Sequence, residues 1–305
     1  MVGAGAGAGP GTHAGRRRLA LRVAFLGTPE DAVPSLRGLL AAGHDVAVVV
    51  TRPDRRRSRG GGLSPSPVKA TATEHGLRVT VDPATVLDAG VELGVVVAYG
   101  RILRPPLLGQ VPLVNLHFSL LPRWRGAAPV ERAILAGDEL SGVCLMEVVD
   151  ELDAGGVHCR VETRIGAEET AGELRARLAD LGADLLLAGL AEGLGPAVPQ
   201  AGEPSWAAKL TPAELRLDWS SPADQLARVV RVGRAWTTVG GKRLLVLAAR
   251  AEVGCGPGAP GDLDGTAVVT GCGRLRLLRV APEGRGASDA EAWLRGARGV
   301  TALGT

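Results

Sequence analysis

A strand–helix–strand unit opens the folded part of the sequence and constrains its fold more than any other feature. The apolar run VAFLG follows Arg22, a helical pattern covers residues 31–42, and the run VAVVVT begins at Val46. Short apolar runs bounded by turn residues are typical of buried strands. Strands joined through a crossover helix lie parallel in one sheet. The sequence therefore predicts an α/β fold built on a parallel sheet.

Three further apolar runs extend this sheet. They cover residues 77–81, 93–98 and 113–117, and helical patterns at residues 67–75 and 128–136 separate some of them. Ligands of open parallel sheets bind beyond the carboxyl ends of the strands. We therefore expect the chemistry in the turns that follow Gly27 and Tyr99 and in the turn around His117.

The chain divides into two domains. Its 305 residues fit two domains of roughly 150 residues each. A capping box formed by Thr170 and Glu173 begins a leucine-rich helix that closes the first domain. Beyond it, short β segments at residues 243–249, 265–270 and 274–280 predict a small barrel or sandwich, for which an OB-like barrel is one candidate. The predicted boundaries are a disordered tail over residues 1–21, a first domain over 22–192, a linker over 193–208 and a second domain over 209–305.

Composition excludes a disordered or membrane-spanning chain. Hydrophobic residues make up 46% of the sequence, which is more than a disordered chain carries. No uncharged apolar run reaches the roughly 18 residues that a membrane span needs. The four cysteines form no C-x-x-C pair, which predicts reduced thiols, no zinc site and a cytoplasmic location.

Positive charge gathers in two places. Residues 206–305 carry 14 Lys and Arg against 9 Asp and Glu, whereas residues 1–205 carry 21 against 23. The second place is a loop after the second strand, which contains Arg52, Arg55, Arg56, Arg57 and Arg59 and precedes three glycines. Both features fit a nucleic-acid surface, and both also fit an ordinary solvated surface.

The segment NLHFSLLPRWRGAAP, residues 115–129, carries the strongest chemical signal. Asn115 and His117 are two positions apart at the end of a predicted strand, so their side chains project to the same face. An amide can donate a hydrogen bond to an oxyanion, and an imidazole can move a proton near neutral pH. The pair therefore suits attack on a carbonyl group, although Asn and His also occur at strand ends as structural residues.

The turn after the first strand argues against a dinucleotide site. It consists of Gly27, Thr28 and Pro29, and it lacks the second and third glycines of a G-x-G-x-x-G fingerprint. Because those glycines let a pyrophosphate approach the backbone, a dinucleotide-dependent oxidoreductase is disfavoured.

Residues 115–129 resemble the HxSLLPxWRGAAP hallmark of the methionyl-tRNA formyltransferase family. The similarity continues at residues 27–29, 51–54, 63–69, 95–100, 152–155, 209–211 and 217–219. The resemblance implies a Rossmann-like formyltransferase domain with a parallel-rich sheet, followed by a smaller OB-like β-barrel domain that binds tRNA. It also implies a cytoplasmic monomer that needs no metal. Such an enzyme transfers the formyl group of 10-formyltetrahydrofolate to the α-amino group of methionyl initiator tRNA for translation initiation.

Residue by residue, the resemblance assigns three kinds of site. The catalytic residues are Asn115, His117 and Asp153, of which Asp153 follows a predicted strand over residues 141–149. The expected folate-binding residues are Ala98, Tyr99, Gly100, Ile102, Leu103, Ser119, Leu120, Leu121 and Pro122. The expected tRNA-binding residues are Arg52, Arg55, Arg56, Arg57, Arg59, Lys209 and Arg243. In the arginine loop, Gly61 and Gly62 replace basic residues that the family usually carries.

Two other functions fit the same residues. A folate-dependent formyltransferase that acts on an amino sugar or another small amine would use the same triad without the basic second domain or the arginine loop. A non-catalytic tRNA-binding paralogue would not need Asn115, His117 and Asp153 together. The salt dependence of a tRNA interaction separates the first alternative from the tRNA enzyme.

Overall fold

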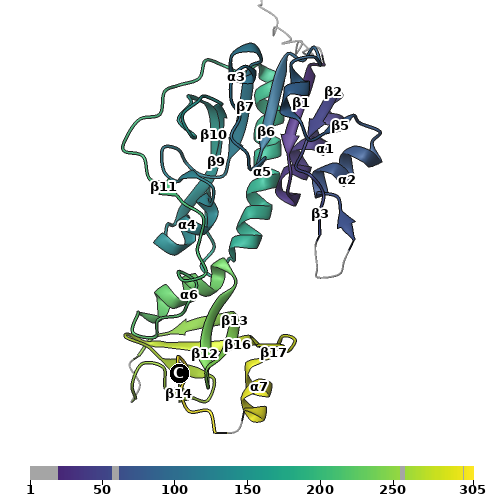
Figure 1. The fold of residues 1–305 in the computed structure, drawn as a ribbon. Coiled ribbons are helices and arrows are strands. Elements are labelled where there is room, and N and C mark those ends of the chain that lie inside the picture. Colours follow the sequence, from purple (N-terminus) through teal and green to yellow (C-terminus); the bar gives the residue numbers. More distant parts are fainter. Residues whose placement is uncertain (1–19, 57–61, 255–257, 298) are drawn as a thin grey trace, which may run out of the picture.

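Two domains make up the computed structural model, which describes residues 20–56, 62–254, 258–297 and 299–305. The segment that follows the long helix of the N-terminal domain returns along that domain before it enters the C-terminal domain (Figure 1). Residues 1–19 of the predicted tail lie outside the described residues, whereas Leu21 packs against the core of the N-terminal domain.

The N-terminal domain is built on a seven-stranded sheet with the order β10-β9-β7-β6-β1-β2-β5. Its strands are β1 (Arg22–Gly27), β2 (Asp45–Val50), β5 (Val79–Thr80), β6 (Leu93–Val97), β7 (Leu113–His117), β9 (Leu140–Glu147) and β10 (Val157–Arg164). The first five pair in parallel, whereas β9 runs antiparallel to both β7 and β10. The predicted parallel-rich sheet is therefore confirmed. Strand β10 was not predicted, because this edge strand alternates apolar and polar residues instead of forming an apolar run.

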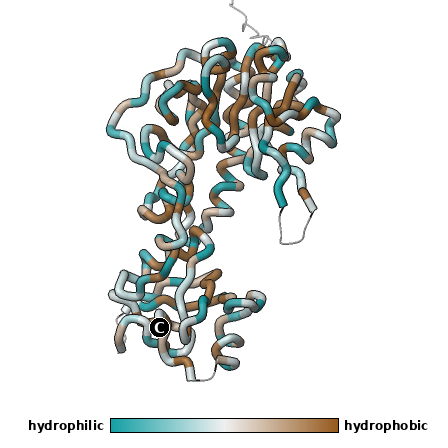
Figure 2. The backbone as a smooth tube through the Cα atoms, in the orientation of Figure 1, coloured by the Kyte–Doolittle hydropathy of each residue, from teal (hydrophilic) through white to brown (hydrophobic). Residues whose placement is uncertain are grey.

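Helices cover both faces of this sheet. They are η1 (Glu30–Ala32), α1 (Val33–Ala41), α2 (Pro67–Glu74), η2 (Pro83–Val86), α3 (Leu107–Gln110), α4 (Pro129–Ala136) and α5 (Ala171–Glu192). Along β1, Val23 and Phe25 face the core covered by α1 and α5, whereas Ala24 and Leu26 face the core beside α3. This alternation of period two places apolar strands at the centre of the domain (Figure 2). In the described part of the chain, no helix combines the length and the apolar character that a bilayer crossing requires.

Helix α5 begins where the sequence predicts. The Thr170 hydroxyl accepts a hydrogen bond from the N–H of Glu173, and the Glu173 carboxylate accepts one from the N–H of Thr170. These reciprocal bonds satisfy backbone donors that the first helical turn leaves free. Leu174 and Leu178 are fully buried, so the leucine repeat belongs to the core.

The C-terminal domain is sheet-rich, as predicted. Its sheet has the order β12-β13-β16-β15-β14, and β17 pairs with β16. The elements are α6 (Ala223–Val232), β12 (Ala235–Val239), β13 (Lys242–Glu252), β14 (Leu263–Asp264), β15 (Ala267–Val269), β16 (Arg274–Pro282), β17 (Ser288–Asp289) and α7 (Ala290–Gly296). Trp219, Leu226 and Leu275 belong to a core of its own. The more specific OB-like closure stays a prediction.

Within the described residues, four short strands lie outside these two sheets. β3 (Arg55–Arg56) and β4 (Leu63–Ser64) form a hairpin that carries the first part of the arginine loop. This hairpin projects from the N-terminal domain toward the side on which the C-terminal domain lies (Figure 1). β8 (Arg125–Gly126) pairs in parallel with β11 (Trp206–Ala207). Because β11 lies within the predicted linker, the linker is docked on the N-terminal domain.

Side chains also join the two domains directly. Arg132 of α4 forms an ion pair with Glu214 over 2.6 Å and donates a hydrogen bond to the backbone oxygen of Ala208. Arg231 of α6 donates to the backbone oxygens of Gly166 and Glu169 over 3.0 and 2.8 Å. The contacts of Arg231 hold α6 against the segment just before α5.

Candidate active site

The strands β1, β6 and β7 lie side by side and end at one edge of the sheet. Ligands of parallel sheets bind at this edge. Thr28, which follows β1, donates from its hydroxyl to the backbone oxygen of Tyr99, which follows β6, over 3.2 Å. His117 is the last residue of β7. The three turns in which we expect chemistry therefore come together.

Asn115 and His117 both lie on β7, between β6 and β9. Their spacing places the two side chains on one face of the sheet. Asn115 is partly exposed, and within the described residues no hydrogen bond engages its side-chain amide. That amide is therefore available to a substrate. His117 is buried, with 5% of its surface exposed.

The two ring nitrogens of His117 have different partners. Nε2 lies 2.8 Å from the backbone oxygen of Trp124. Because a carbonyl oxygen only accepts hydrogen bonds, Nε2 carries the hydrogen of the neutral ring. Nδ1 lies 3.6 Å from Oδ2 of Asp153. The neutral ring therefore presents an unprotonated Nδ1 beside a carboxylate.

Asp153 lies in the loop between β9 and β10, and the predicted position after the strand that is β9 agrees with this. Its φ of 50° falls in the left-handed region, which is costly for a residue other than glycine and persists only where the surroundings fix it. Its Oδ2 accepts a hydrogen bond from the N–H of Gly126 over 2.8 Å. Thus His117 faces Asp153 directly, and Asn115 precedes His117 by two positions on the same strand.

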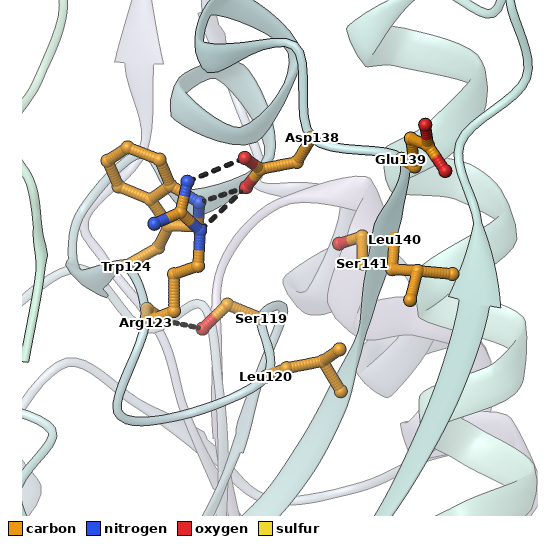
Figure 3. Close-up of a pocket in the computed structure, with 8 residues that line it drawn as sticks. All are labelled: Ser119, Leu120, Arg123, Trp124, Asp138, Glu139, Leu140 and Ser141. Carbon is orange, nitrogen blue, oxygen red and sulfur yellow. Dashed lines mark hydrogen bonds and ion pairs between the residues drawn. The ribbon is translucent and has the colours of Figure 1, made fainter. Parts of the chain in front are cut away.

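The backbone oxygen of Trp124 binds Nε2 of His117. Figure 3 shows the indole of Trp124 beside Arg123 and Asp138. Trp124 also has a left-handed backbone, with a φ of 63°. Its indole Nε1 donates to Oδ2 of Asp138 over 2.7 Å, and its N–H donates to the hydroxyl of Ser205 over 2.9 Å. Arg123 forms two hydrogen bonds with Asp138 and stacks on the indole at 4.5 Å from the ring centre. A cavity of about 280 Å³ beside this cluster is lined by Ser119, Leu120, Arg123, Trp124, Asp138, Glu139, Leu140 and Ser141.

Backbone hydrogen bonds from the linker help to support the loop that follows β7. The N–H of Arg125 donates to the backbone oxygen of Ser205 over 2.8 Å. The N–H groups of Ala127 and Ala128 both donate to the backbone oxygen of Ala207, over 2.9 and 3.0 Å. Sequence reasoning missed these contacts, because a segment rich in Gly and Pro is typical of a free connection. The hallmark itself contained Trp124 and Arg125, but it gave no sign of their partners.

Cys144 faces His117 across the pairing of β7 with β9. Burial raises the pKa of the Cys144 thiol, so this thiol stays protonated at neutral pH. A protonated thiol is a poor nucleophile. Cys144 therefore serves as a core residue beside the site, in agreement with the predicted structural role of the cysteines.

The residues expected to bind folate separate into exposed and buried groups. Ala98, Gly100 and Ile102 are exposed, and 70% of the surface of Ile102 is accessible. Tyr99 and Leu103 belong to the core beside α3, so only their backbone can meet a ligand. In the second segment Ser119 and Leu121 are buried, whereas Leu120 and Pro122 are partly exposed.

The residues expected to bind tRNA lie in two regions. Arg55 and Arg56 are exposed on β3, whereas Arg57 and Arg59 lie outside the described residues. Arg52 lies nearer the strand ends, because a Cβ placed on Gly100 would be 3.6 Å from its guanidinium group. In the other region, Lys209 and Arg243 are exposed, and the Arg243 guanidinium group stacks on Trp236 at 4.2 Å from the ring centre.

Known proteins match both domains. Residues 21–190 match the family model for formyl transferases, and residues 209–298 match the model for the formyl transferase C-terminal domain. The methionyl-tRNA formyltransferase of Halorhodospira halophila is 45% identical over 303 residues, which cover 92% of this chain and 97% of that protein. The methionyl-tRNA formyltransferase of Jannaschia sp. is 42% identical over 296 residues, which cover 91% of this chain and 97% of that protein.

Solved structures share the fold at lower identity. The methionyl-tRNA formyltransferase from Clostridium thermocellum aligns with 77% of this chain and 94% of its own, with a TM-score of 0.56 and 14% identity. HypX from Aquifex aeolicus in complex with tetrahydrofolic acid aligns with 92% of this chain, with a TM-score of 0.66 and 17% identity. That match spans 48% of HypX, about half of its length. These structures support the fold alone.

Proposed function

The chain belongs to the methionyl-tRNA formyltransferase family, and we propose that it formylates the α-amino group of methionyl initiator tRNA with 10-formyltetrahydrofolate as the donor. One observation supports the chemistry most. Nδ1 of His117 lies 3.6 Å from Oδ2 of Asp153, and the amide of Asn115 on the same strand has no side-chain partner in the described residues. A hydrogen-bond donor and a proton-handling pair therefore lie at the same strand end.

A folate derivative supplies the formyl group. We assign its ring system to the turn after β6, because Ala98 and Gly100 are exposed there and small residues let backbone groups pair with the polar edge of a pterin. The exposed side chain of Ile102 can cover a flat ring face, and this contact would remove its apolar surface from water. We propose the 10-formyl derivative because its formyl carbon is bonded to a nitrogen that an attacking amine can replace.

The reaction exchanges one nitrogen for another on the formyl carbon. The lone pair of the neutral α-amino group forms the new C–N bond, and the carbonyl π electrons move onto oxygen. Asn115 donates a hydrogen bond to this developing oxyanion. When the carbonyl group re-forms, the bond to N10 breaks and N10 takes up the proton that His117 has accepted from the amine, which returns the imidazole to its neutral form. The products are formylmethionyl-tRNA and tetrahydrofolate.

His117 and Asp153 handle the proton that the amine loses. The unprotonated Nδ1 accepts this proton, and the imidazolium so formed is stabilised by the carboxylate of Asp153. Nε2–H keeps its bond to Trp124 throughout, so the ring does not have to turn. The positive charge of the imidazolium also stabilises the oxyanion held by Asn115.

Two basic surfaces would bind the tRNA. The β3–β4 hairpin carries Arg55 and Arg56 and projects toward the side of the C-terminal domain (Figure 1). The region from residue 206 to the end has five more basic than acidic residues, 14 against 9. Neutralised phosphates release counterions, so both surfaces would favour a polyanionic acceptor over a small amine.

Transfer of a radiolabelled formyl group tests this proposal. We expect transfer onto charged initiator tRNA and much less onto charged elongator tRNA. Asn115→Ala and His117→Ala should each lower turnover by roughly 100-fold or more, since each removes an oxyanion donor or the proton acceptor. Folate binding should survive in both variants. Transfer to an amino sugar but not to tRNA would contradict the proposal, as would turnover near the wild-type rate in either folded variant.

A further inference from the structure

Gln200 connects two loops of the active site through a single side chain. Its Nε2 donates hydrogen bonds to the backbone oxygens of Asp153 and Gly155, over 2.8 and 2.9 Å. Its Oε1 accepts hydrogen bonds from Nε and from a terminal nitrogen of Arg125, over 3.0 and 2.8 Å. Gln200 belongs to the linker, yet its partners are the proposed catalytic residue Asp153, Gly155 two positions later, and Arg125, which follows Trp124.

Only one orientation of the Gln200 amide satisfies these partners. If oxygen and nitrogen were exchanged, the amide oxygen would face two carbonyl oxygens. The amide nitrogen would then face a guanidinium group, which has no acceptor. The observed orientation pairs every polar atom. Arg125 is buried, with 9% of its surface exposed, and it also forms an ion pair with Glu151 over 3.1 Å. Losing Gln200 would leave this buried cation with the ion pair but without two of its hydrogen bonds.

The loop that Gln200 binds needs external support. Asp153 has a φ of 50°, a conformation that its own backbone does not favour. Gly155 is packed so closely that a Cβ added to it would lie 2.0 Å from the backbone oxygen of Glu147. Gly126 holds the Asp153 carboxylate through Oδ2, and Gln200 holds the Asp153 carbonyl. One contact therefore holds the side chain of Asp153 and the other holds its backbone, and together they fix the position of the carboxylate.

We infer that Gln200 is a positioning residue, which keeps the Asp153 carboxylate within reach of Nδ1 of His117. This inference rests on the proposed function, because it concerns the proton transfer assigned to that pair. A displacement of about 1 Å at a catalytic group can lower the rate by roughly 100-fold. The linker thus completes the active site in addition to connecting the domains.

Two substitutions separate the donor role of Gln200 from its contact with Arg125. Gln200→Glu has nearly the same shape and keeps an acceptor for Arg125, but it has no hydrogen to donate and turns a carboxylate toward two carbonyl oxygens. Gln200→Met removes all four hydrogen bonds. Glu203→Gln changes an exposed residue of the same linker and serves as the matched control.

Single-turnover formyl transfer and binding measurements should then distinguish the variants. We expect both Gln200 variants to lower the rate of formyl transfer by roughly 10- to 100-fold, while the Kd values for folate and tRNA change by less than about two-fold. Glu203→Gln should behave as wild type. In an Asp153→Asn background, Gln200→Met should cause little further loss, because residues that act through one another are not additive.

A spectroscopic readout keeps the test independent of turnover. The ¹⁵N chemical shift of His117 Nδ1 should move in the same direction in Gln200→Glu and in Asp153→Asn, and thermal unfolding should show that both variants are folded. A wild-type rate in folded Gln200→Glu, or an equal further loss on the Asp153→Asn background, would overturn the inference. Failure of the wild-type protein to formylate methionyl-tRNA would instead overturn the proposed function, and the chemical shift would still decide the role of Gln200.

Discussion

Nε2 of His117 donates its hydrogen to the backbone oxygen of Trp124 over 2.8 Å, and this contact determines which nitrogen can accept a proton. The opposite ring nitrogen, Nδ1, is left facing Asp153. The loop after β7 therefore sets the tautomer of the histidine, and the loop after β9 supplies its counter-charge. Neither loop alone would give a directed proton acceptor.

The first prediction concerns this tautomer. In the neutral ring the hydrogen should be on Nε2, because the Trp124 carbonyl cannot donate. Long-range ¹H–¹⁵N correlation spectra of histidine-labelled protein measure the two nitrogens separately. A neutral ring with its hydrogen on Nδ1 would contradict the assignment and would require another proton acceptor.

The second prediction concerns the support of Trp124. Trp124→Phe removes the indole N–H that donates to Asp138, and it should lower the free energy of unfolding by about 1–3 kcal/mol, as expected for a hydrogen bond to a charged group. We also expect slower turnover, since the left-handed backbone that presents the carbonyl to His117 loses a restraint.

Trp236→Phe is the matched control for this variant. Its indole donates to the backbone oxygen of Pro212 in the C-terminal domain, so stability should fall without a change in the chemical step. Chemical denaturation and single-turnover rates measure both effects. Equal turnover of Trp124→Phe and wild type would show that Trp124 supports only the fold.

The third prediction concerns the arginine loop. Replacing Arg55, Arg56, Arg57 and Arg59 by Ser removes four cations. The KM for tRNA should rise, and the salt dependence of binding should flatten by up to about four counterions. Folate affinity should stay unchanged. Some binding should persist, because the basic C-terminal region keeps its charge.

Arg160→Ser with Arg164→Ser provides the control for charge alone. Both residues are exposed on β10, the strand at the edge of the sheet opposite β5. For each variant, the change in the salt dependence of tRNA binding is divided by the number of arginines removed, and the two values are compared. An equal change per arginine in the hairpin variant and in the β10 variant would show that the hairpin contributes only general charge.

The fourth prediction concerns pH and the domain interface. Hydrogen bonds from Arg132 and from the backbone of Thr211 lower the pKa of Glu214 to about 2, below its usual value. A lowered pKa means that the carboxylate stabilises the folded state above pH 4.5 and loses this effect as the pH falls toward 2. Because 38% of the side chain is exposed, solvent screening limits the effect to about 1 kcal/mol.

Glu214→Gln tests this interface without a large change in shape. Its destabilisation should be greatest above pH 4.5 and should shrink toward zero near pH 2. Thermal unfolding over this range measures the difference, and Glu203→Gln, at an exposed position of the linker, is the control. A destabilisation of Glu214→Gln that does not change with pH would show that the charge of Glu214 does not stabilise the fold.

Local sequence patterns determined the parallel-rich sheet, the capped helix α5 and the placement of the Asn115–His117 pair. Each of these depends on residues close together in the chain, because strand and helix periods recur within a few positions. The resemblance in residues 115–129 continues at residues 152–155 and there pointed to Asp153, which the structure places beside His117. The edge strand β10 also alternates apolar and polar residues, but it forms no apolar run, so the apolar runs that indicated the central strands did not indicate this one.

Only the tertiary structure decided how the site is held in place. The contact of Trp124 with Ser205 joins residues 81 positions apart, and that of Arg125 with Gln200 joins residues 75 positions apart. No local period encodes such a pairing, since it depends on the path of the linker back across the N-terminal domain. The sequence by itself therefore determined the reacting groups, whereas the return of the linker decided the backbone positions that orient them.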